Sequence, residues 1–482
     1  MAAIETAPAA AGINGAASDL IAELRALVGE KGIVAGDDVG KRAGSWYGED
    51  HRAAAIVRPA DTASLSAVLA ACSRHRAAVV VQGGLTGQSG GATAQPGEVA
   101  ISLDRLRAIE EIDATNCTMT IGAGATLLEA QLSAAYYGLF LAPDWGARGS
   151  ATIGGGIATN GGGTNVLRYG MMRDHVLGLE VVLADGTIIS SLNKLVKNNT
   201  GFDLKQLFIG SEGTLGVITK AVLRLHVQPS STSTALIGCG SLEQTLALLA
   251  HLRKTLGPNM TSFEVMWDSF FELVVAESGH ARPLDAVHNF YILAESRGFS
   301  AAQDEDQFAE ALSTALEAGL VENAAICSNA TQRSALWALR DDVDALRRAL
   351  HPMITFDISL GIDQLGAYLS EVEHEASARF PELQFIVFGH LGDGNIHICC
   401  GIGEHEAADR ASLSAIIYRH VDRCSGSISA EHGIGVDKRA YIRHSRNSSE
   451  LALMWKLKET LDPANILNPG RVLPPREETD GR

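Results

Sequence analysis

The sequence of 482 residues has little positive charge and no long apolar stretch. Its 39 Lys and Arg are outnumbered by 56 Asp and Glu, which gives a formal net charge of −17. Because phosphate contacts need clustered basic side chains, this balance argues against a general nucleic-acid-binding protein. No uninterrupted apolar run approaches the roughly 18 residues of a membrane-spanning helix, so we expect no transmembrane segment. The first basic residue is Arg25, so the N-terminal stretch does not have the pattern of a secretory signal.

Cysteine is sparse and scattered, and two familiar nucleotide-binding motifs are missing. The seven cysteines include no Cys-x-x-Cys pair, which removes the cysteine-based ligand framework of a zinc or iron–sulfur site. An odd, dispersed set of cysteines predicts reduced thiols and a cytoplasmic protein. Neither G-x-G-x-x-G nor G-x-x-x-x-G-K-[ST] occurs in the glycine clusters. An NAD-binding or ATPase interpretation therefore loses its usual sequence support.

Glycine, in contrast, is abundant and concentrated. Of the 50 glycines, 24 lie between residues 81 and 216. They form three clusters, VQGGLTGQSGG at 81–91, ATIGGGIATNGGG at 151–163 and FIGSEGTLGVIT at 208–219. Glycine lets successive backbone N–H groups point into one concavity, where they can bind an anion. The alternatives are a surface loop for the first cluster and tight loop packing for the other two. Three separated loops suggest one long ligand spread over a domain.

Composition changes along the chain and divides it into segments. After an expected leader and helical segment (1–48), short β-like runs alternate with glycine clusters, which predicts an α+β nucleotide-binding domain over 49–228. The stretch QPSSTST at 228–234 is typical of a linker. Longer amphipathic helical patterns then alternate with β-like runs, which predicts a second α+β domain over 229–474 with a sheet covered by helices.

Two histidines flank an expected turn in FGHLGDGNIH. Asp393-Gly394 is a signal for a two-residue hairpin turn, and such a turn would place His390 directly opposite His397. Opposed residues lie about 5 Å apart at Cβ, so two imidazoles would reach one divalent metal. The alternative is a pair of hydrogen-bonded histidines in a sheet. The later motif AEHGIG at 430–435 places Glu431 beside His432, which allows two roles at one site or a capping carboxylate beside an incidental histidine.

The longer motifs together resemble a known family. The three glycine clusters, with PDWGARGS and RYGMMRDHVLGLEVVLADG, resemble the FAD domain of the vanillyl-alcohol-oxidase type. FGHLGDGNIH, SAEHGIG and LDPANILNPGRVLP resemble the FAD-linked oxidase C-terminal domain of FAD-dependent D-2-hydroxyacid dehydrogenases. The resemblance covers roughly residues 49–474 and implies an α+β fold in which 460–474 pack back on the FAD domain. It also implies an enzyme that oxidises D-lactate, D-2-hydroxyglutarate or a relative.

The resemblance implies where FAD binds. The first loop would hold the pyrophosphate, later positions would line the ribityl chain and the ring, and Gly213 and Ile218 would close the adenine side. Some relatives attach FAD covalently through a histidine in the first loop, where this chain has Leu85, so non-covalent FAD is expected. The implied cofactor-binding residues are Gln82, Gly83, Gly84, Leu85, Thr86, Gly87, Gln88, Pro143, Asp144, Ser150, Gly154, Gly155, Asn160, Gly161, Gly213, Ile218 and Asn468.

The resemblance also assigns the chemical groups. His390, His397 and Glu431 would hold a divalent metal, with zinc the first choice and manganese, iron or cobalt as alternatives. His432 would accept the hydroxyl proton as general base, and Arg340 would bind the substrate carboxylate. Without the resemblance, Arg340 would be interpreted as an exposed helix charge.

Three positions depart from the hydroxyglutarate-specific pattern. Where those relatives have Thr, Lys and Asn, this chain has Asp344, Thr355 and Cys399. An added carboxylate and a lost lysine would repel a second substrate carboxylate, so we expect a monocarboxylate such as D-lactate or a larger analogue. The alternatives are D-2-hydroxyglutarate, a metal-free flavin oxidoreductase or synthase of the same fold, and a non-enzymatic scaffold. Electrons would leave to an external acceptor, such as an electron-transfer flavoprotein, a quinone or a cytochrome, and a homodimer is expected.

Overall fold

The structure is a computed structural model that describes residues 13–46 and 48–476. Its first part begins with α1 (Ile13–Val28), which packs on α2 (Thr62–Arg74). Helix α2 starts at a capping box formed by Asp61 and Ser64 and buries Leu65, Val68, Leu69 and Cys72 along one face. This spacing of apolar residues is typical of a helix that covers a sheet. The expected leader, residues 1–12, lies outside the described residues.

Two sheets form the first half of the molecule, which is the half expected to bind FAD. The first has the order β1-β2-β4-β3, with β1 (Ile33–Ala35), β2 (Ala55–Val57), β4 (Val99–Ser102) and β3 (Val79–Gln82). The second has the order β5-β6-β10-β8-β9, with β5 (Ile109–Asp113), β6 (Thr118–Gly122), β10 (Val217–Arg224), β8 (Val176–Val182) and β9 (Ile188–Ser191).

Short elements connect these sheets and lie close to the glycine clusters. A small pair is formed by β7 (Leu139–Phe140) and β11 (His226–Val227). The helices are α3 (Leu127–Tyr136), α4 (Ile153–Thr159), α5 (Val166–Tyr169), α6 (Met172–His175) and α7 (Lys205–Phe208).

The second half is built on one antiparallel sheet of seven strands in the order β15-β12-β14-β13-β17-β18-β16. Its strands are β12 (Ser231–Cys239), β13 (Met260–Trp267), β14 (Phe290–Gly298), β15 (Asn323–Ile326), β16 (Met353–Ser359), β17 (Gln384–His390) and β18 (Asn395–Gly401). Strand β12 already begins at Ser231, so the expected linker over 228–234 is shorter than predicted. Pairing with β14 satisfies the backbone of those serines and threonines.

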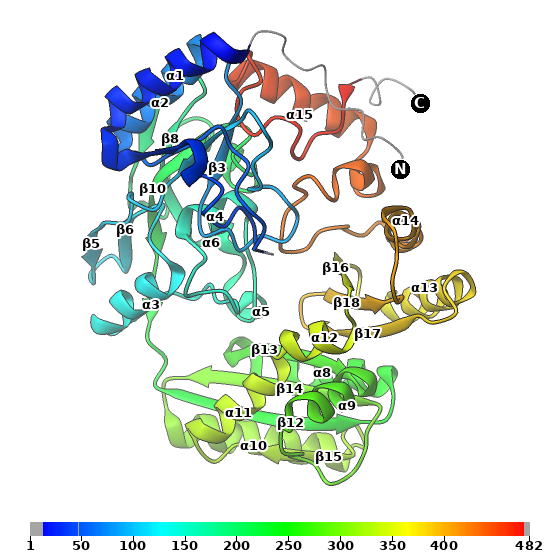
Figure 1. Ribbon diagram of the computed structural model, residues 1–482. Coiled ribbons are helices and arrows are strands. Elements are labelled where there is room, and N and C mark those ends of the chain that lie inside the picture. Colours follow the sequence, from blue (N-terminus) through cyan, green and yellow to red (C-terminus); the bar gives the residue numbers. More distant parts are fainter. Residues whose placement is uncertain (1–12, 47, 477–482) are drawn as a thin grey trace.

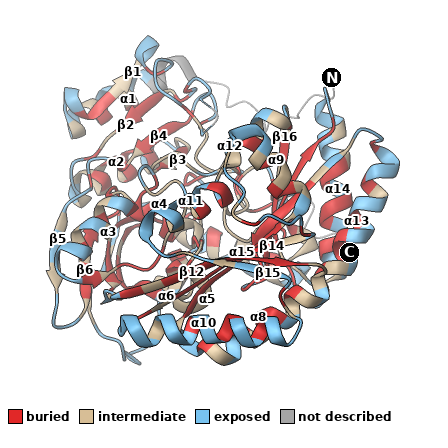
Figure 2. Cartoon of the chain, turned by 90° about the horizontal axis from the view of Figure 1, so that it is seen from below, coloured by how far each residue is buried: buried red, intermediate tan, exposed pale blue. Residues whose placement is uncertain are grey.

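Helices cover both faces of this sheet. One core joins the sheet to α8 (Leu242–Leu256), α10 (Ala301–Glu317), α13 (Leu365–Arg379) and α14 (Ala407–Arg423). The other joins it to α9 (Asp268–Ser278), α11 (Ala330–Arg340) and α12 (Val343–Ala349). Figure 2 shows buried strands behind helices such as α8 and α10, whose outer faces are exposed. The expected α+β class, with a sheet covered by helices, is confirmed by this architecture.

The chain end returns to the first half. Helix α15 (Ser448–Leu461), red in Figure 1, packs on the first half: Leu461 lies against its core, and Lys458 Nζ donates to the Thr214 carbonyl (2.9 Å). Beyond it, the Val79 amide donates to the Ile466 carbonyl (2.7 Å), and the Asn468 amide donates to the Val79 carbonyl (2.8 Å). The end of the chain therefore extends the first sheet beside β3. Among the described residues, none of the helices combines the length and apolarity needed to cross a bilayer.

Candidate active site

The two histidines lie on the hairpin of β17 and β18, but in a register that differs from the expected one. His390 pairs with Asn395, and His397 pairs with Phe388. The turn is a four-residue loop, 391–394, because the Gly394 amide donates back to the His390 carbonyl (3.2 Å). The prediction of a two-residue turn with His390 directly opposite His397 is therefore wrong. A shift of two residues keeps both side chains on the same face, and the two rings lie 5.3 Å apart as diagonal neighbours.

Glu431 completes a group of three side chains of the types that bind metal ions. One donor atom from each of His390, His397 and Glu431 lies within 4.8 Å of the other two. His390 Nε2 is 3.3 Å from Glu431 Oε1. The loop that carries Glu431 is attached to β16, since the Glu431 amide donates to Asp357 Oδ2 (2.8 Å). His432 follows on the same loop and is half-buried.

Two buried residues fix the orientation of His390. Continuing the register of β13 with β17 places Glu264 directly opposite His390, and Glu264 accepts from His390 Nδ1 (2.9 Å). Glu264 also pairs with Arg340 at the end of α11 (2.7 Å). With Nδ1 engaged, Nε2 is the nitrogen of His390 that faces Glu431. Glu264 was not among the predicted site residues, although a single carboxylate in the apolar strand TSFEVMW was a usable signal.

The surroundings shift the pKa values of the two histidines in opposite directions. Burial lowers the pKa of His397 to about 4, so its ring is neutral and has a free lone pair near neutral pH. Burial would also lower the pKa of His390, but the adjacent Glu264 and Glu431 carboxylates raise it well above its usual value. The pKa of Glu431 is lowered in spite of its burial, because His390 and His397 stabilise the carboxylate.

The three glycine loops converge on the edge of the FAD-binding half. A Cβ on Gly84 would lie 1.9 Å from the Ser150 carbonyl oxygen, and one on Gly83 would lie 2.4 Å from Thr152 Oγ1. The third loop joins the second through Glu212, whose amide donates to the Ala158 carbonyl (2.8 Å). Only bare backbone fits at these contacts. The three loops therefore pack tightly against one another, as in the alternative interpretation of the second and third clusters.

The remaining positions expected to bind FAD differ in exposure and in their contacts. Four are buried: Pro143, Gly154, Gly161 and Gly213. Those that are partly exposed are Leu85, Thr86 and Gln88 in the first loop and Gly155 and Asn160 in the second, whereas Gly87 is exposed. Leu85 has a positive φ of 54°. Three others are occupied by internal contacts. Ile218 is buried in β10, Asp144 pairs with Arg148 (3.0 Å), and Gln82 bonds His51 (3.0 Å).

Asn468 is likewise held within the protein. Its Oδ1 accepts from the Val81 amide (2.9 Å), and its Nδ2 donates to the Glu212 carbonyl (2.6 Å). Both ends of the amide are thus used to join the chain terminus to the first and third loops. The structure supports a positioning role for Asn468 within the loops.

The three positions that depart from the hydroxyglutarate pattern do not lie together. Thr355 and Cys399 form a cross-strand pair on β16 and β18, two residues beyond Asp357 and His397 and on the same face. Asp344 is exposed on α12 and pairs with Arg347 (3.0 Å). It lines a separate cavity of about 570 Å³ with Arg347, Arg348 and His351. The structure therefore brings Thr355 and Cys399 to the site, but not Asp344.

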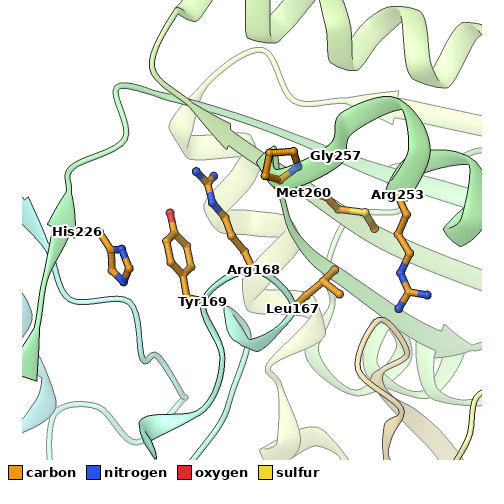
Figure 3. A pocket seen from close by; sticks show the side chains of 8 residues that line it. Leu167, Arg168, Tyr169, His226, Arg253, Gly257 and Met260 are labelled. Atoms are coloured by element: carbon orange, nitrogen blue, oxygen red, sulfur yellow. The ribbon is translucent and has the colours of Figure 1, made fainter. Parts of the chain in front are cut away.

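A second cavity, of about 490 Å³, lies between α5, β11 and the end of α8 (Figure 3). Arg253 lines this cavity and donates a hydrogen bond to the Gly392 carbonyl in the 391–394 loop (2.5 Å). Leu167 also contacts the loop, since a Cβ on Gly392 would lie 3.0 Å from its Cδ2. The hairpin that carries the histidines is therefore supported from both halves of the molecule.

Comparison with known proteins identifies this architecture. Residues 53–191 match the FAD binding domain family, and residues 228–472 match the family of FAD linked oxidases, C-terminal domain. The chain is 37% identical to a D-2-hydroxyglutarate dehydrogenase of Xanthomonas citri pv. viticola, over 87% of this chain and 89% of the relative. It is 34% identical to a D-2-hydroxyglutarate dehydrogenase of Stutzerimonas stutzeri, over 94% of this chain and 98% of that relative. The chain belongs to the FAD-dependent D-2-hydroxyacid dehydrogenases.

The fold of this dehydrogenase is shared with more distant flavoenzymes. A crystal structure of p-cresol methylhydroxylase with substrate bound superposes with a TM-score of 0.76 at 15% identity, covering 95% of this chain and 97% of that one. At this identity the likeness shows the fold alone. It confirms the expected vanillyl-alcohol-oxidase-type architecture of the FAD-binding half.

Proposed function

We propose that this dehydrogenase needs a divalent metal as well as FAD and oxidises a D-2-hydroxy acid to the 2-oxo acid. The observation that carries the proposal is the convergence of His390, His397 and Glu431. This group lies against the glycine loops, because a Cβ on Gly162 would lie 4.0 Å from Glu431 Oε1. The loop after His432 also bonds the first glycine loop, since the Val436 amide donates to the Ser89 carbonyl (2.9 Å).

The donor set fits a catalytic metal site. Two histidines and one carboxylate leave coordination positions open for substrate, as in catalytic zinc sites. Zinc is the first choice, and manganese, iron or cobalt accept the same ligands. When bound, the metal would stabilise negative charge on the substrate hydroxyl oxygen. The protein contributes the orientation of His390 through Glu264 (2.8 Å), which is the usual role of a carboxylate behind a ligand histidine.

The residues around this site supply the remaining steps. We assign to His432 the role of taking the hydroxyl proton, which imidazole performs well near neutral pH. FAD, when bound, accepts the hydride from the substrate Cα. Arg340 binds the substrate carboxylate and thereby aligns Cα, because a guanidinium fixes a carboxylate in a defined plane. One proton and one hydride leave the substrate, which yields the 2-oxo acid.

We propose a monocarboxylate substrate, such as D-lactate or an analogue with a larger side chain. Two cations lie at the metal group, Arg340 and Lys438. Arg340 pairs with Glu264 (2.7 Å) and would be used by the first substrate carboxylate, and Lys438 lies 3.8 Å from Asp357. A second substrate carboxylate would have to be desolvated beside these acids. The second candidate is D-2-hydroxyglutarate, which is favoured by the names of the two relatives.

Steady-state kinetics with a redox dye test the proposal. D-lactate, D-mandelate and D-2-hydroxyglutarate are compared, each with and without a chelator, and metal content is measured on the same preparation. Loss of activity on chelation, recovered by zinc or manganese, supports metal dependence. Full activity without metal would establish the rival metal-free flavoenzyme. A higher kcat/KM for D-2-hydroxyglutarate than for both monocarboxylates would overturn the proposed substrate class.

The proposal extends to the cellular setting. Electrons pass to an external acceptor, and an electron-transfer flavoprotein, a quinone and a cytochrome are the classes to be compared. A homodimer and a cytoplasmic location belong to the same proposal. Reduction assays with each acceptor class and sedimentation velocity test these points separately.

A further inference from the structure

We propose that Glu264 is a positioning residue that holds the metal ligand His390 and the substrate-binding Arg340 in one rigid unit. Metal affinity and substrate affinity would then depend on the same buried carboxylate. The inference rests on the proposed function and deepens it, because it concerns how the two halves of that site are joined.

The geometry places Glu264 between the two groups. Its Oε1 accepts from His390 Nδ1 (2.9 Å), and its Oε2 accepts from Arg340 Nε (3.0 Å). Arg340 Nη2 also lies 3.3 Å from His390 Nε2. Glu264 lies on β13, His390 on β17 and Arg340 at the end of α11. One side chain therefore links three elements that are distant in sequence.

Burial makes this link strong. Glu264 is 1%, His390 5% and Arg340 6% exposed. A charge taken out of water is tolerated only when it is paired and hydrogen-bonded. Removing the charge of Glu264 by glutamine would leave Arg340 without its main counter-ion, and one acceptor oxygen would remain where His390 and Arg340 now use two. Both groups would then be free to reorient.

The orientation of Arg340 matters for the substrate. Its Nε and Nη2 face Glu264, and its Nη1 pairs with Asp341 (3.2 Å). The plane of the guanidinium is thus set before any substrate arrives. Because the Arg340 guanidinium is already oriented, it loses less conformational entropy when the substrate carboxylate binds, which favours substrate affinity.

The same sheet offers a matched control in Glu295 on β14. It is also 1% exposed, and it is satisfied by Thr234 (2.9 Å), Trp337 (3.0 Å) and Arg297 (2.8 Å). None of these partners belongs to the metal group. Replacing Glu295 by glutamine disturbs a buried carboxylate and its arginine. Trp337 lies on α11 with Arg340, but Glu295 makes no hydrogen bond to Arg340 or His390.

The test compares Glu264→Gln, Glu264→Asp and Glu295→Gln with the wild-type flavoprotein. Zinc affinity is measured by competition with a chromophoric chelator, and KM and kcat for the best substrate are measured at saturating metal. We expect Glu264→Gln to weaken zinc binding by at least tenfold and to raise KM by at least tenfold. Glu264→Asp should show smaller losses of both kinds, and Glu295→Gln should stay within twofold of wild type.

The outcomes separate this inference from the proposed function. A wild-type protein that binds no metal would overturn the proposed function and this inference with it. A wild type that binds zinc, together with a Glu264→Gln variant within twofold in both constants, would overturn the inference alone. If Glu264→Gln yields no folded flavoprotein, Glu264→Asp decides: a zinc affinity and a KM both within twofold of wild type would overturn the inference.

Discussion

The carboxylate of Glu212 accepts a hydrogen bond from the Gly435 amide (2.9 Å) and another from the neighbouring Ile434 amide (2.7 Å). Glu212 belongs to the third glycine loop of the FAD-binding half, whereas Gly435 ends the motif that carries Glu431 and His432. A Cβ on Gly435 would lie 2.0 Å from the Ser89 carbonyl oxygen of the first loop. The loop with the proposed base and metal ligand is therefore fixed directly to the loops proposed to bind the flavin.

Replacing Glu212 by alanine should loosen this loop. Two amides would lose their acceptor, and buried donors without partners cost about 1–3 kcal/mol each. We expect a lower melting temperature and a kcat reduced by roughly tenfold or more, as is usual when catalytic groups are displaced. Differential scanning calorimetry and dye-reduction kinetics measure the two effects. Glu110→Ala, which removes a surface pair with Lys220, is the control; equal effects of the two variants would contradict the prediction.

Gly84→Ala should prevent FAD binding. The new methyl group would meet the Ser150 backbone carbonyl at 1.9 Å, and neither of the two loops can yield without losing its shape. We expect purified Gly84→Ala to contain less than a tenth of the wild-type flavin, as measured by absorbance after denaturation. Gly40→Ala, where an added Cβ has no neighbour within 4 Å, should retain full flavin content. A normally loaded Gly84→Ala variant would count against the proposed cofactor loops.

His432→Ala should separate proton transfer from binding. A positioned general base contributes roughly 10²–10⁴-fold to a rate, so kcat should fall by that range. Flavin content and zinc affinity should not change, because His432 is not one of the three converging metal donors. His405→Ala serves as the control, since His405 is only partly buried and bonds only the Gly403 carbonyl among the described residues (2.9 Å). A kcat within threefold of wild type would exclude His432 as the base.

His175 should make stability depend on pH. It is 1% exposed in the FAD-binding half, and burial lowers its pKa to about 4. In the unfolded chain its pKa is near its usual value of roughly 6.5, so only the unfolded state gains a proton between these values. Stability should therefore fall as the pH drops from about 6.5 to 4, by up to about 1.4 kcal/mol per pH unit from this group.

Urea unfolding at several pH values, with His175→Phe beside the wild type, isolates this contribution. The phenylalanine variant keeps an aromatic ring next to His226, whose ring lies 5.6 Å away, but it cannot be protonated. Its stability should decline less steeply over the acidic range. Parallel curves for the two proteins would show that His175 does not titrate as expected.

Local sequence was sufficient to predict the α+β class. The glycine clusters predicted glycine-rich loops, and the alternation of helical and β-like runs predicted the α+β class. The hairpin was also expected, but its register was not. Asp393-Gly394 is a strong signal for a two-residue turn, yet the His390 carbonyl is taken by the Gly394 amide in a four-residue loop. The same sequence permits a two-residue and a four-residue turn, and the main-chain hydrogen bond of Gly394 decides for the four-residue one.

The sequence by itself determined which chemical groups this dehydrogenase has: three glycine loops, two histidines seven residues apart, and a Glu-His pair. Only the tertiary structure decided which of them meet. Glu264 and His390 are 126 residues apart in sequence, and no local pattern records a pairing made between separate strands. Asp344, by contrast, faces solvent beside Arg347, because its place on α12 depends on how that helix packs. Long-range pairing is set by burial and register across the whole sheet, and these are properties of the folded chain.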